Sequence, residues 1–118
     1  MKWETQEYVR KNGRSPIRDY LSSLSTRHRV KVLRSIQLLE EFGPDLGMPH
    51  VRHLEDGIFE LRTQFGNNIF RTIFFHWYEN KLVLTHGFTK KTQKTPRSEI
   101  EKAKMYRADF LKRKGEFK

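Results

Sequence analysis

The 118-residue sequence contains no cysteine, and this absence narrows the chemistry open to the protein. Without thiols there are no disulfide bonds, no thiolate nucleophile and no cysteine-bound zinc. Long apolar runs are missing too, since no stretch approaches the roughly 18 apolar residues of a membrane span. The first residues, MKWETQEYVRKNG, contain no apolar signal-peptide core. We therefore expect a cytoplasmic protein that does not enter the membrane.

Carboxylates are scarce relative to cations. The chain has 14 Asp and Glu against 24 Lys and Arg, a formal net charge of +10. The excess is uneven, because residues 86–118 hold 11 basic and 4 acidic side chains, or +7 of the total. Such a balance favours a polyanionic partner. The length fits one domain over residues 1–118, and 13% aromatic residues within 36% apolar content indicate a small, aromatic-rich core.

The N-terminal half predicts one strand followed by two helices. Residues 2–9 carry strand formers, and the turn residues 11–13 end them. Ser15 is a suitable N-cap with Pro16 at the first helical position. A second helix is expected from about Thr26 to Phe42, before the stop signal at residues 43–44. The apolar stripe expected on this helix consists of Val30, Leu33, Ile36 and Leu39.

The C-terminal half changes to a period of about two and then returns to helical spacing. Strands are expected over residues 57–62, 69–78 and 81–88, with turns at 66–68 and 79–81. The last helix is expected to open at Thr95 and Pro96, and its apolar face consists of Ile100, Ala103, Tyr106 and Phe110. The order β-α-α-β-β-β-α predicts an α+β fold in which an antiparallel meander carries its helices on one face.

The candidate site lies on the meander. Alternation directs Phe59 and Leu61 to one face of their strand and Glu60 and Arg62 to the other. Arg71 follows a tight turn, so it is expected beside Arg62 on the neighbouring strand, where two like charges need an anion. The third strand and its loop bring further candidates to the same end of the sheet: His86, Lys90, Lys91 and Lys94.

Several cations directed at one phosphate are what RNA cleavage requires. Attack by a ribose 2′-hydroxyl builds negative charge around phosphorus, and preplaced Arg and Lys side chains stabilise that charge without a metal. His86 is the obvious proton carrier nearby. Unpaired bases can stack on aromatic rings, and five rings near the cations are candidates: Phe65, Phe70, Phe88, Trp77 and Tyr78.

Each feature also has a structural interpretation. The lysines can protect a sheet edge against aggregation, and Arg62 and Arg71 can pair with Glu60 or Glu55. His86 can be structural, and most phenylalanines, Phe59, Phe74 and Phe75 among them, are expected in the core. Two histidines and two carboxylates within residues 50–56 suggest a metal, but Arg52 among them opposes a cation, and we expect no metal site. No glycine-rich phosphate loop is present.

The sequence also resembles a known family. The runs GIFELR at 57–62, IFRTIFF at 69–75 and HGFTKKTQKTP at 86–96, followed by Glu99 and Ile100, are similar to the phage-derived branch of HigB-type toxins in the RelE/ParE superfamily. The resemblance is close in the C-terminal half, and the element order extends it over the chain. It implies a toxin of a type II toxin-antitoxin module that cuts messenger RNA, usually on the ribosome, with no cofactor.

The resemblance also implies site residues and partners. Arg62, Arg71 and Lys91, with Lys90 beside them, match the family's site cations. Lys94, Arg97 and Arg107 are weaker candidates for RNA contact. The tyrosine or histidine that some relatives supply as acid or base after the basic loop has no clear equivalent, because Tyr106 lies too far along the last helix. His86 is therefore the first candidate for proton transfer and Glu60 a distant second.

The expected partner is a HigA-like, DNA-binding antitoxin in a toxin-antitoxin hetero-oligomer. Messenger RNA is the expected substrate, and the ribosome is a further expected partner. Two alternatives stay open, because some members of the superfamily inhibit DNA gyrase and cut no RNA, and because a basic surface also suits a non-catalytic nucleic-acid-binding module.

Overall fold

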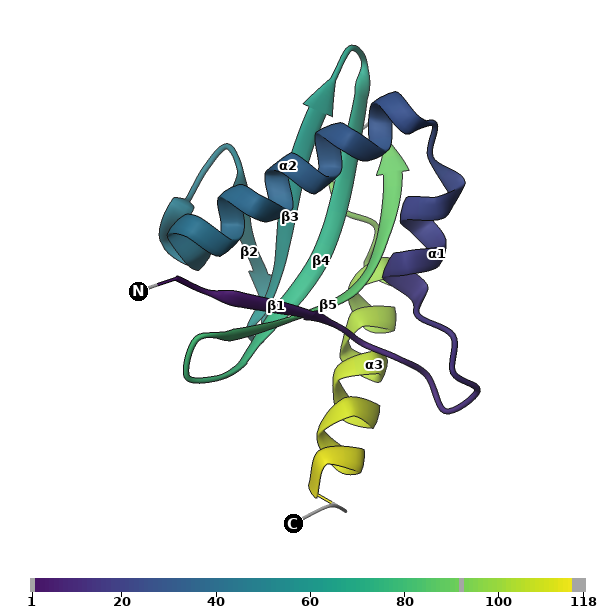
Figure 1. Ribbon diagram of the computed structural model, residues 1–118, viewed down its shortest axis with the longest axis vertical. Helices are drawn as coiled ribbons and strands as arrows, with labels where there is room; N and C mark the ends of the chain where they lie inside the picture. The colour runs from purple at the N-terminus through teal and green to yellow at the C-terminus, as the bar shows by residue number, and fades with distance from the viewer. Residues whose placement is uncertain (1, 92, 116–118) are drawn as a thin grey trace.

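The computed structural model describes residues 2–91 and 93–115, which form an α+β fold around a five-stranded sheet (Figure 1). The strand order is β1-β5-β4-β3-β2, with β1 parallel to β5 and the other neighbours antiparallel. The strands are β1 (Glu4–Glu7), β2 (Val51–Glu55), β3 (Ile58–Phe65), β4 (Asn68–Tyr78) and β5 (Lys81–Lys90). No helix among the described residues is long and apolar enough to cross a membrane.

The meander has one strand more than the sequence analysis predicts. β2 pairs antiparallel with β3 and extends the sheet, although the sequence analysis assigns no element to residues 51–55. The overlooked signal is Asp56-Gly57, where both residues have positive φ, 50° and 77°. An Asp-Gly pair at these angles closes a tight hairpin. The charged side chains of β2 hid its alternation, because an edge strand buries little of its surface.

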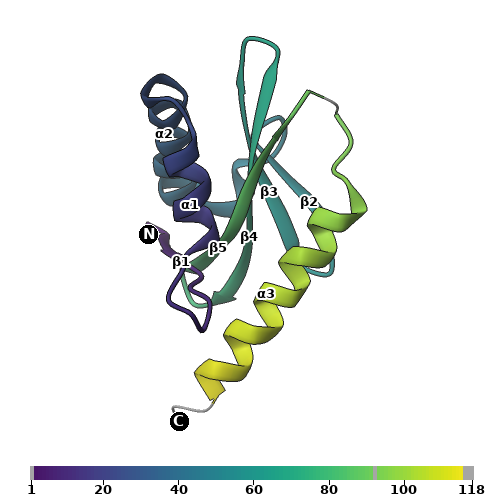
Figure 2. The ribbon, with the colours of Figure 1, turned by 90° about the vertical axis from the view of Figure 1, so that its right-hand side faces the viewer.

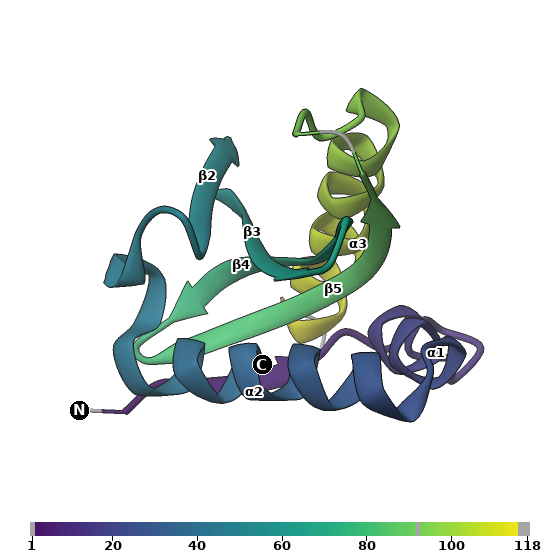
Figure 3. The ribbon, with the colours of Figure 1, turned by 90° about the horizontal axis from the view of Figure 1, so that it is seen from above.

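Helices cover both faces of the sheet, so the expectation that all helices pack on one face is wrong. Helices α1 (Pro16–Ser23) and α2 (Thr26–Phe42) lie on one face, and α3 (Arg97–Gly115) lies on the other (Figures 2 and 3). The physical reason is in β4, where every residue from Ile69 to Phe75 is buried. A strand buried on both sides needs a cover on both sides.

Two apolar cores therefore flank the sheet. The core under α1 and α2 includes Ile17, Val32, Leu39, Leu61 and Phe74. The core under α3 includes Tyr8, Ile73, Phe75, Ala103 and Phe110.

The helix boundaries follow the capping signals in the sequence. The Ser15 and Ser25 hydroxyls each accept a backbone N–H in the first turn of their helix, at 3.2 Å. Gly43 ends α2 at φ 70°, and a short 3-10 turn (Gly43–Leu46) follows. The stripe expected on α2 is partly wrong. Val30 and Leu33 are 41% and 42% exposed.

The buried stripe of α2 is Val32, Ile36 and Leu39 instead. These residues also have helical spacing. Periodicity alone therefore could not decide which of the two stripes faces the core.

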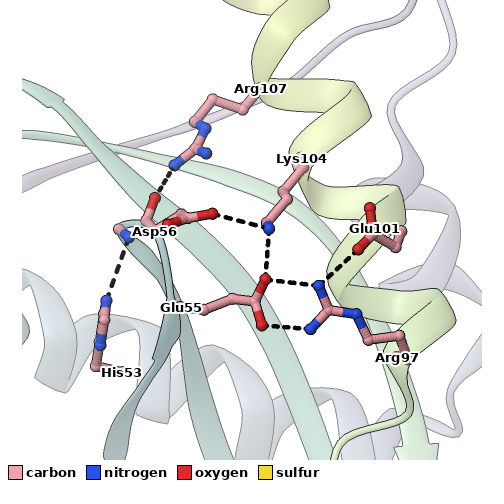
Figure 4. A network of polar contacts seen from close by, with 8 residues as sticks. His53, Glu55, Asp56, Arg97, Glu101, Lys104 and Arg107 are labelled. Carbon is pink, nitrogen blue, oxygen red and sulfur yellow. Dashed lines mark hydrogen bonds and ion pairs between the residues drawn. The ribbon is translucent and has the colours of Figure 1, made fainter.

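Charged groups fasten α3 to the turn between β2 and β3 (Figure 4). The Glu55 carboxylate accepts hydrogen bonds from Arg97 and Lys104. Lys104 also lies 2.9 Å from the Asp56 carboxylate, and Arg107 donates to the Asp56 carbonyl. The clasp made by these five residues holds the first half of α3 against the edge of the sheet.

Candidate functional site

The sheet brings the two predicted arginines together. Arg62 on β3 and Arg71 on β4 are directly opposite partners in the antiparallel register. Directly opposite residues have side chains on the same face. That face is the one covered by α3, because Arg71 is also opposite Phe88, which belongs to the core under this helix. The expectation that Arg62 and Arg71 are cross-strand neighbours is confirmed.

Arg71 is neutralised inside the protein. Its Nε lies 2.8 Å from Glu60 Oε1, and neither side chain is exposed to solvent. The Thr95 hydroxyl donates to the two Glu60 oxygens at 3.1 and 2.9 Å. Burial lowers the pKa of Arg71, the Glu60 carboxylate opposes this shift, and the positive charge of Arg62 adds to it. The anion that this pair of arginines needs is therefore Glu60, as the structural interpretation proposed for Arg71.

Gln93, in the loop that precedes α3, contacts both arginines. Arg62 Nη2 donates to the Gln93 side-chain oxygen at 2.5 Å, and Arg71 Nη2 donates to the Gln93 carbonyl at 2.9 Å. Arg62 remains partly exposed, whereas Arg71 is fully buried. Of the two, Arg62 is the side chain that can meet a ligand without rearrangement of the core.

Arg52 joins this cluster, although the sequence analysis considered it only as a charge opposed to a metal. It is the register partner of Glu60 across the β2–β3 ladder, and its positive charge lowers the pKa of Arg71. Its side chain is exposed. Recognition of the Asp56-Gly57 hairpin signal would have found it, because the hairpin determines which residue lies opposite Glu60.

The lysines lie at the same end of the sheet. Lys90 is the last residue of β5 and, by alternation, shares the face of Phe88 and Arg71. Lys90 and the following Lys91 are exposed, and neither has an ion-pair partner among residues 2–91 and 93–115. Lys94 lines a shallow groove of about 160 Å³ together with Arg52 and Thr95. The contact of one anion with Arg62, Arg71 and Lys91, with Lys90 beside them, stays a prediction.

His86 is enclosed in the core of the sheet. It is 4% exposed, its Nδ1 lies 3.1 Å from the Thr85 hydroxyl and its Nε2 lies 3.3 Å from Glu99 Oε1. Burial lowers the pKa of His86 to about 4, although the Glu99 carboxylate opposes the shift. The ring is thus neutral at pH 7. These contacts support the structural interpretation, and a role in proton transfer stays a prediction.

The structure uses two further candidates for its own contacts. Arg97 and Arg107 belong to the clasp on α3, so their guanidinium groups are engaged by Glu55 and by the Asp56 carbonyl (Figure 4). His53 accepts a hydrogen bond from the Gly57 N–H at 3.2 Å and helps to close the same turn. Among the residues that the structure describes, no three His, Asp or Glu side chains are grouped as a metal site requires.

The aromatic candidates divide by burial. Phe70 and Phe88 are buried, so the expectation that they offer stacking faces to bases is wrong. Phe65 and Trp77 are partly exposed, and Tyr78 is 44% exposed.

The phenylalanines expected in the core lie there or pack against it. Phe74 and Phe75 are core residues as expected, and the partly buried Phe59 stacks on Phe74 with ring centroids 5.4 Å apart.

Comparison with known proteins gives two kinds of match. The family model described as "Phage derived protein Gp49-like (DUF891)" matches residues 19–107. Two curated relatives, each called "Probable endoribonuclease HigB1", come from Mycobacterium tuberculosis strains CDC 1551 / Oshkosh and ATCC 25618 / H37Rv. Each is 41% identical over 59 residues, which is 50% of this chain and 46% of the relative. The match thus spans about half the length of these relatives.

Proposed function

Because the chain belongs to the Gp49-like family of phage-derived proteins, we propose that it is the toxin of a toxin-antitoxin module and that it acts as an endoribonuclease on messenger RNA. The name of the two HigB1 relatives supports this assignment, and so does the resemblance in the strands and the basic loop. The observation that carries the proposal is the position of Arg62. This partly exposed cation lies beside a neutralised Arg71–Glu60 pair, and its guanidinium donates to the neutral side-chain amide of Gln93.

The proposed reaction is an internal phosphoryl transfer. The 2′-oxygen of one ribose forms a bond to the adjacent phosphorus, the bond from phosphorus to the 5′-oxygen of the next nucleotide breaks, and a 2′,3′-cyclic phosphate remains. A base accepts the 2′-hydroxyl proton, and an acid protonates the departing 5′-oxygen. Arg62, Lys90 and Lys91 stabilise the charge that accumulates on the phosphoryl oxygens.

Arg71 and Gln93 take different roles in this proposal. Arg71 is a positioning residue, since it is buried on Glu60 and holds the Gln93 carbonyl. The Gln93 side-chain oxygen occupies a position on Arg62 that suits a phosphate oxygen. An anionic acceptor makes a stronger, charge-assisted hydrogen bond than an amide. We expect the scissile phosphate to replace Gln93 on Arg62.

The proposed partners follow from the same charge. Messenger RNA engaged on the ribosome is the proposed substrate, and a HigA-like antitoxin is the proposed inhibitor, with acidic or helical segments that cover the basic surface. The net charge of +10 supports both, because an anionic partner relieves the repulsion among the cations.

Primer extension on a translated message tests the function. We expect the purified chain to produce cleavage sites, and Arg62→Ala or Lys91→Ala to reduce the cleavage rate by about 10²-fold, as for loss of one transition-state donor. Lys112→Ala is the matched control, because it removes one charge from an exposed position on α3. Circular dichroism verifies that each variant is folded.

Other outcomes of this assay assign other functions. Full cleavage by Arg62→Ala contradicts the proposed role of this residue. Intact message together with inhibited DNA supercoiling assigns the gyrase alternative. Salt-sensitive RNA binding with neither effect assigns a non-catalytic module. The same assay on message without ribosomes determines whether translation is required.

A further inference from the structure

The charges of α2 are arranged against its dipole. Its N-terminal half carries Arg27, Arg29, Lys31 and Arg34, no acidic residue occupies the first turn, and Glu40 and Glu41 lie at its C-terminal end. The N-terminus of a helix is its positive end, so cations there and anions at the opposite end are both unfavourable. The effect is confined to the first and last turns, so Arg27 and Arg29 at one end and Glu40 and Glu41 at the other reduce the stability of the helix. This cost calls for a reason outside the helix.

One of these cations has an internal role. Arg29 donates hydrogen bonds to the carbonyls of Leu21 at 2.8 Å and Leu24 at 2.9 Å, and so it satisfies backbone groups at the end of α1. The other three have no carboxylate partner within residues 2–91 and 93–115. Arg27 and Arg34 are exposed and Lys31 is partly exposed.

These three cations form one surface with an aromatic ring. Arg27, Lys31 and Arg34 are spaced i, i+4 and i+7, which places them along one edge of the helix. The Arg27 guanidinium lies 5.0 Å from the centroid of the Phe65 ring, and the Lys31 ammonium lies 5.3 Å from it. We call Arg27, Lys31, Arg34 and Phe65 the α2 platform.

The α2 platform and Arg62 lie on opposite faces of the same end of the sheet. Phe65 is the last residue of β3, three positions after Arg62, so alternation directs the two side chains to different faces. Figure 2 places the β3–β4 hairpin between α2 on one side and the end of β5 with the beginning of α3 on the other. A single-stranded nucleic acid that passes around this hairpin can therefore contact both surfaces.

We propose that the α2 platform is a second binding site for RNA, which holds unpaired nucleotides that flank the phosphate on Arg62. Arg27, Lys31 and Arg34 contact successive phosphates, and Phe65 stacks on a base. The ring is the reason to prefer single-stranded RNA to an acidic protein, because base stacking on an aromatic ring bordered by cations is the usual arrangement in proteins that bind single strands. This inference rests on the proposed function for the identity of its ligand.

Binding of an uncleavable RNA tests the platform directly. The probe is a single-stranded oligonucleotide with a 2′-O-methyl group on every ribose, which blocks the attacking oxygen, and fluorescence anisotropy measures its affinity at several salt concentrations. For Arg27→Gln/Lys31→Gln/Arg34→Gln we expect the slope of log affinity against log salt to decrease by about 2, since each phosphate contact contributes about 0.7.

A second variant isolates the ring. Phe65→Leu keeps apolar contact with the core and removes the stacking face, so we expect affinity to fall about tenfold with the salt slope unchanged. The matched control is Arg10→Gln/Lys11→Gln/Lys112→Gln, which removes the same charge from exposed positions elsewhere. Equal losses in the platform and control variants would overturn the proposal, because they would indicate a response to net charge alone.

The design separates this inference from the proposed function. Arg62→Ala is expected to reduce the cleavage rate by about 10²-fold and retain most binding of the blocked RNA. The platform variants are expected to raise the RNA concentration for half-maximal cleavage more than they lower the maximal rate. Platform-dependent binding by a chain that cleaves no RNA supports the platform and contradicts the proposed function. Unchanged RNA binding with lost binding of poly-L-glutamate overturns the platform as an RNA site and assigns it to an acidic protein.

Discussion

A buried charge pair stands at the centre of the site, and its two members depend on each other. Removal of one partner leaves an uncompensated charge in the interior, which typically costs about 3–5 kcal/mol. We therefore expect Glu60→Gln to lower the free energy of unfolding by this amount in urea denaturation, since Arg71 loses its counter-charge. Arg71→Met combined with Glu60→Leu is expected to recover most of the loss, because no charge then remains buried. A small change in the free energy of unfolding for Glu60→Gln alone would contradict the idea that Arg71 depends on this counter-charge.

The site was only partly predictable at the scale of single residues. The neighbourhood of Arg62 and Arg71 follows from a tight turn and a period of two, and both are visible in the sequence. The complete burial of Arg71 is not visible, because it depends on where the segment after β5 places Thr95 and Gln93. The path of a loop is determined by tertiary contacts, whereas the register of a hairpin is determined locally.

At the scale of elements, α1 docks on β5 through a position without a side chain. A Cβ on Gly87 would lie 2.2 Å from the Tyr20 ring, so this glycine provides the space in which the ring packs. We expect Gly87→Ala to destabilise the protein by about 1–3 kcal/mol, as overpacking does. Thermal unfolding measures the effect. Tyr20→Ala in the same chain makes room for the methyl group, so the two changes together should cost less than the sum of each alone, and strict additivity would argue against the contact.

The elements that the sequence predicted well are those with local signals. Ser15 and Gly43 mark helix ends, and the turns at residues 66–68 and 79–81 mark the limits of β3, β4 and β5. Alternation of apolar and polar residues identifies β3. The placement of helices on both faces of the sheet was not predicted, although the sequence of β4 indicates it. Its run from Ile69 to Phe75 is too apolar for a strand with one wet face, and a strand covered twice requires a helix on each side.

At the scale of the whole molecule, two groups give stability a defined pH dependence. The pKa of His86 is about 4 in the folded protein and 6.5 as its ordinary value. Between about pH 6.5 and pH 4, His86 is therefore protonated in the unfolded chain but neutral in the folded chain. Stability is full above pH 6.5 and decreases as the pH falls through this window, by up to about 3 kcal/mol. Urea denaturation at pH 7 and pH 4.5 measures the loss.

Variants assign this loss to its source. His86→Gln should flatten the curve between pH 6.5 and 4, and a change at the exposed His50 should leave it as it is. Hydrogen bonds from Arg97 and Lys104 lower the pKa of Glu55 to about 2, so the clasp on α3 weakens only below the ordinary value of 4.5. A loss confined to pH values below 4.5 would exclude His86 as its source.

The parallel pairing of β1 with β5 has a consequence for synthesis. Glu4 lies opposite Lys81, and Tyr8 shares a core with Phe110, so β1 and the residues after it are completed by segments that leave the ribosome much later. During translation the arginines on β3 and β4 exist before α3 can cover them. In a nascent chain the Arg71–Glu60 ion pair therefore lacks its cover and the hydrogen bonds from Thr95. The cation cluster takes its final form only when α3 emerges.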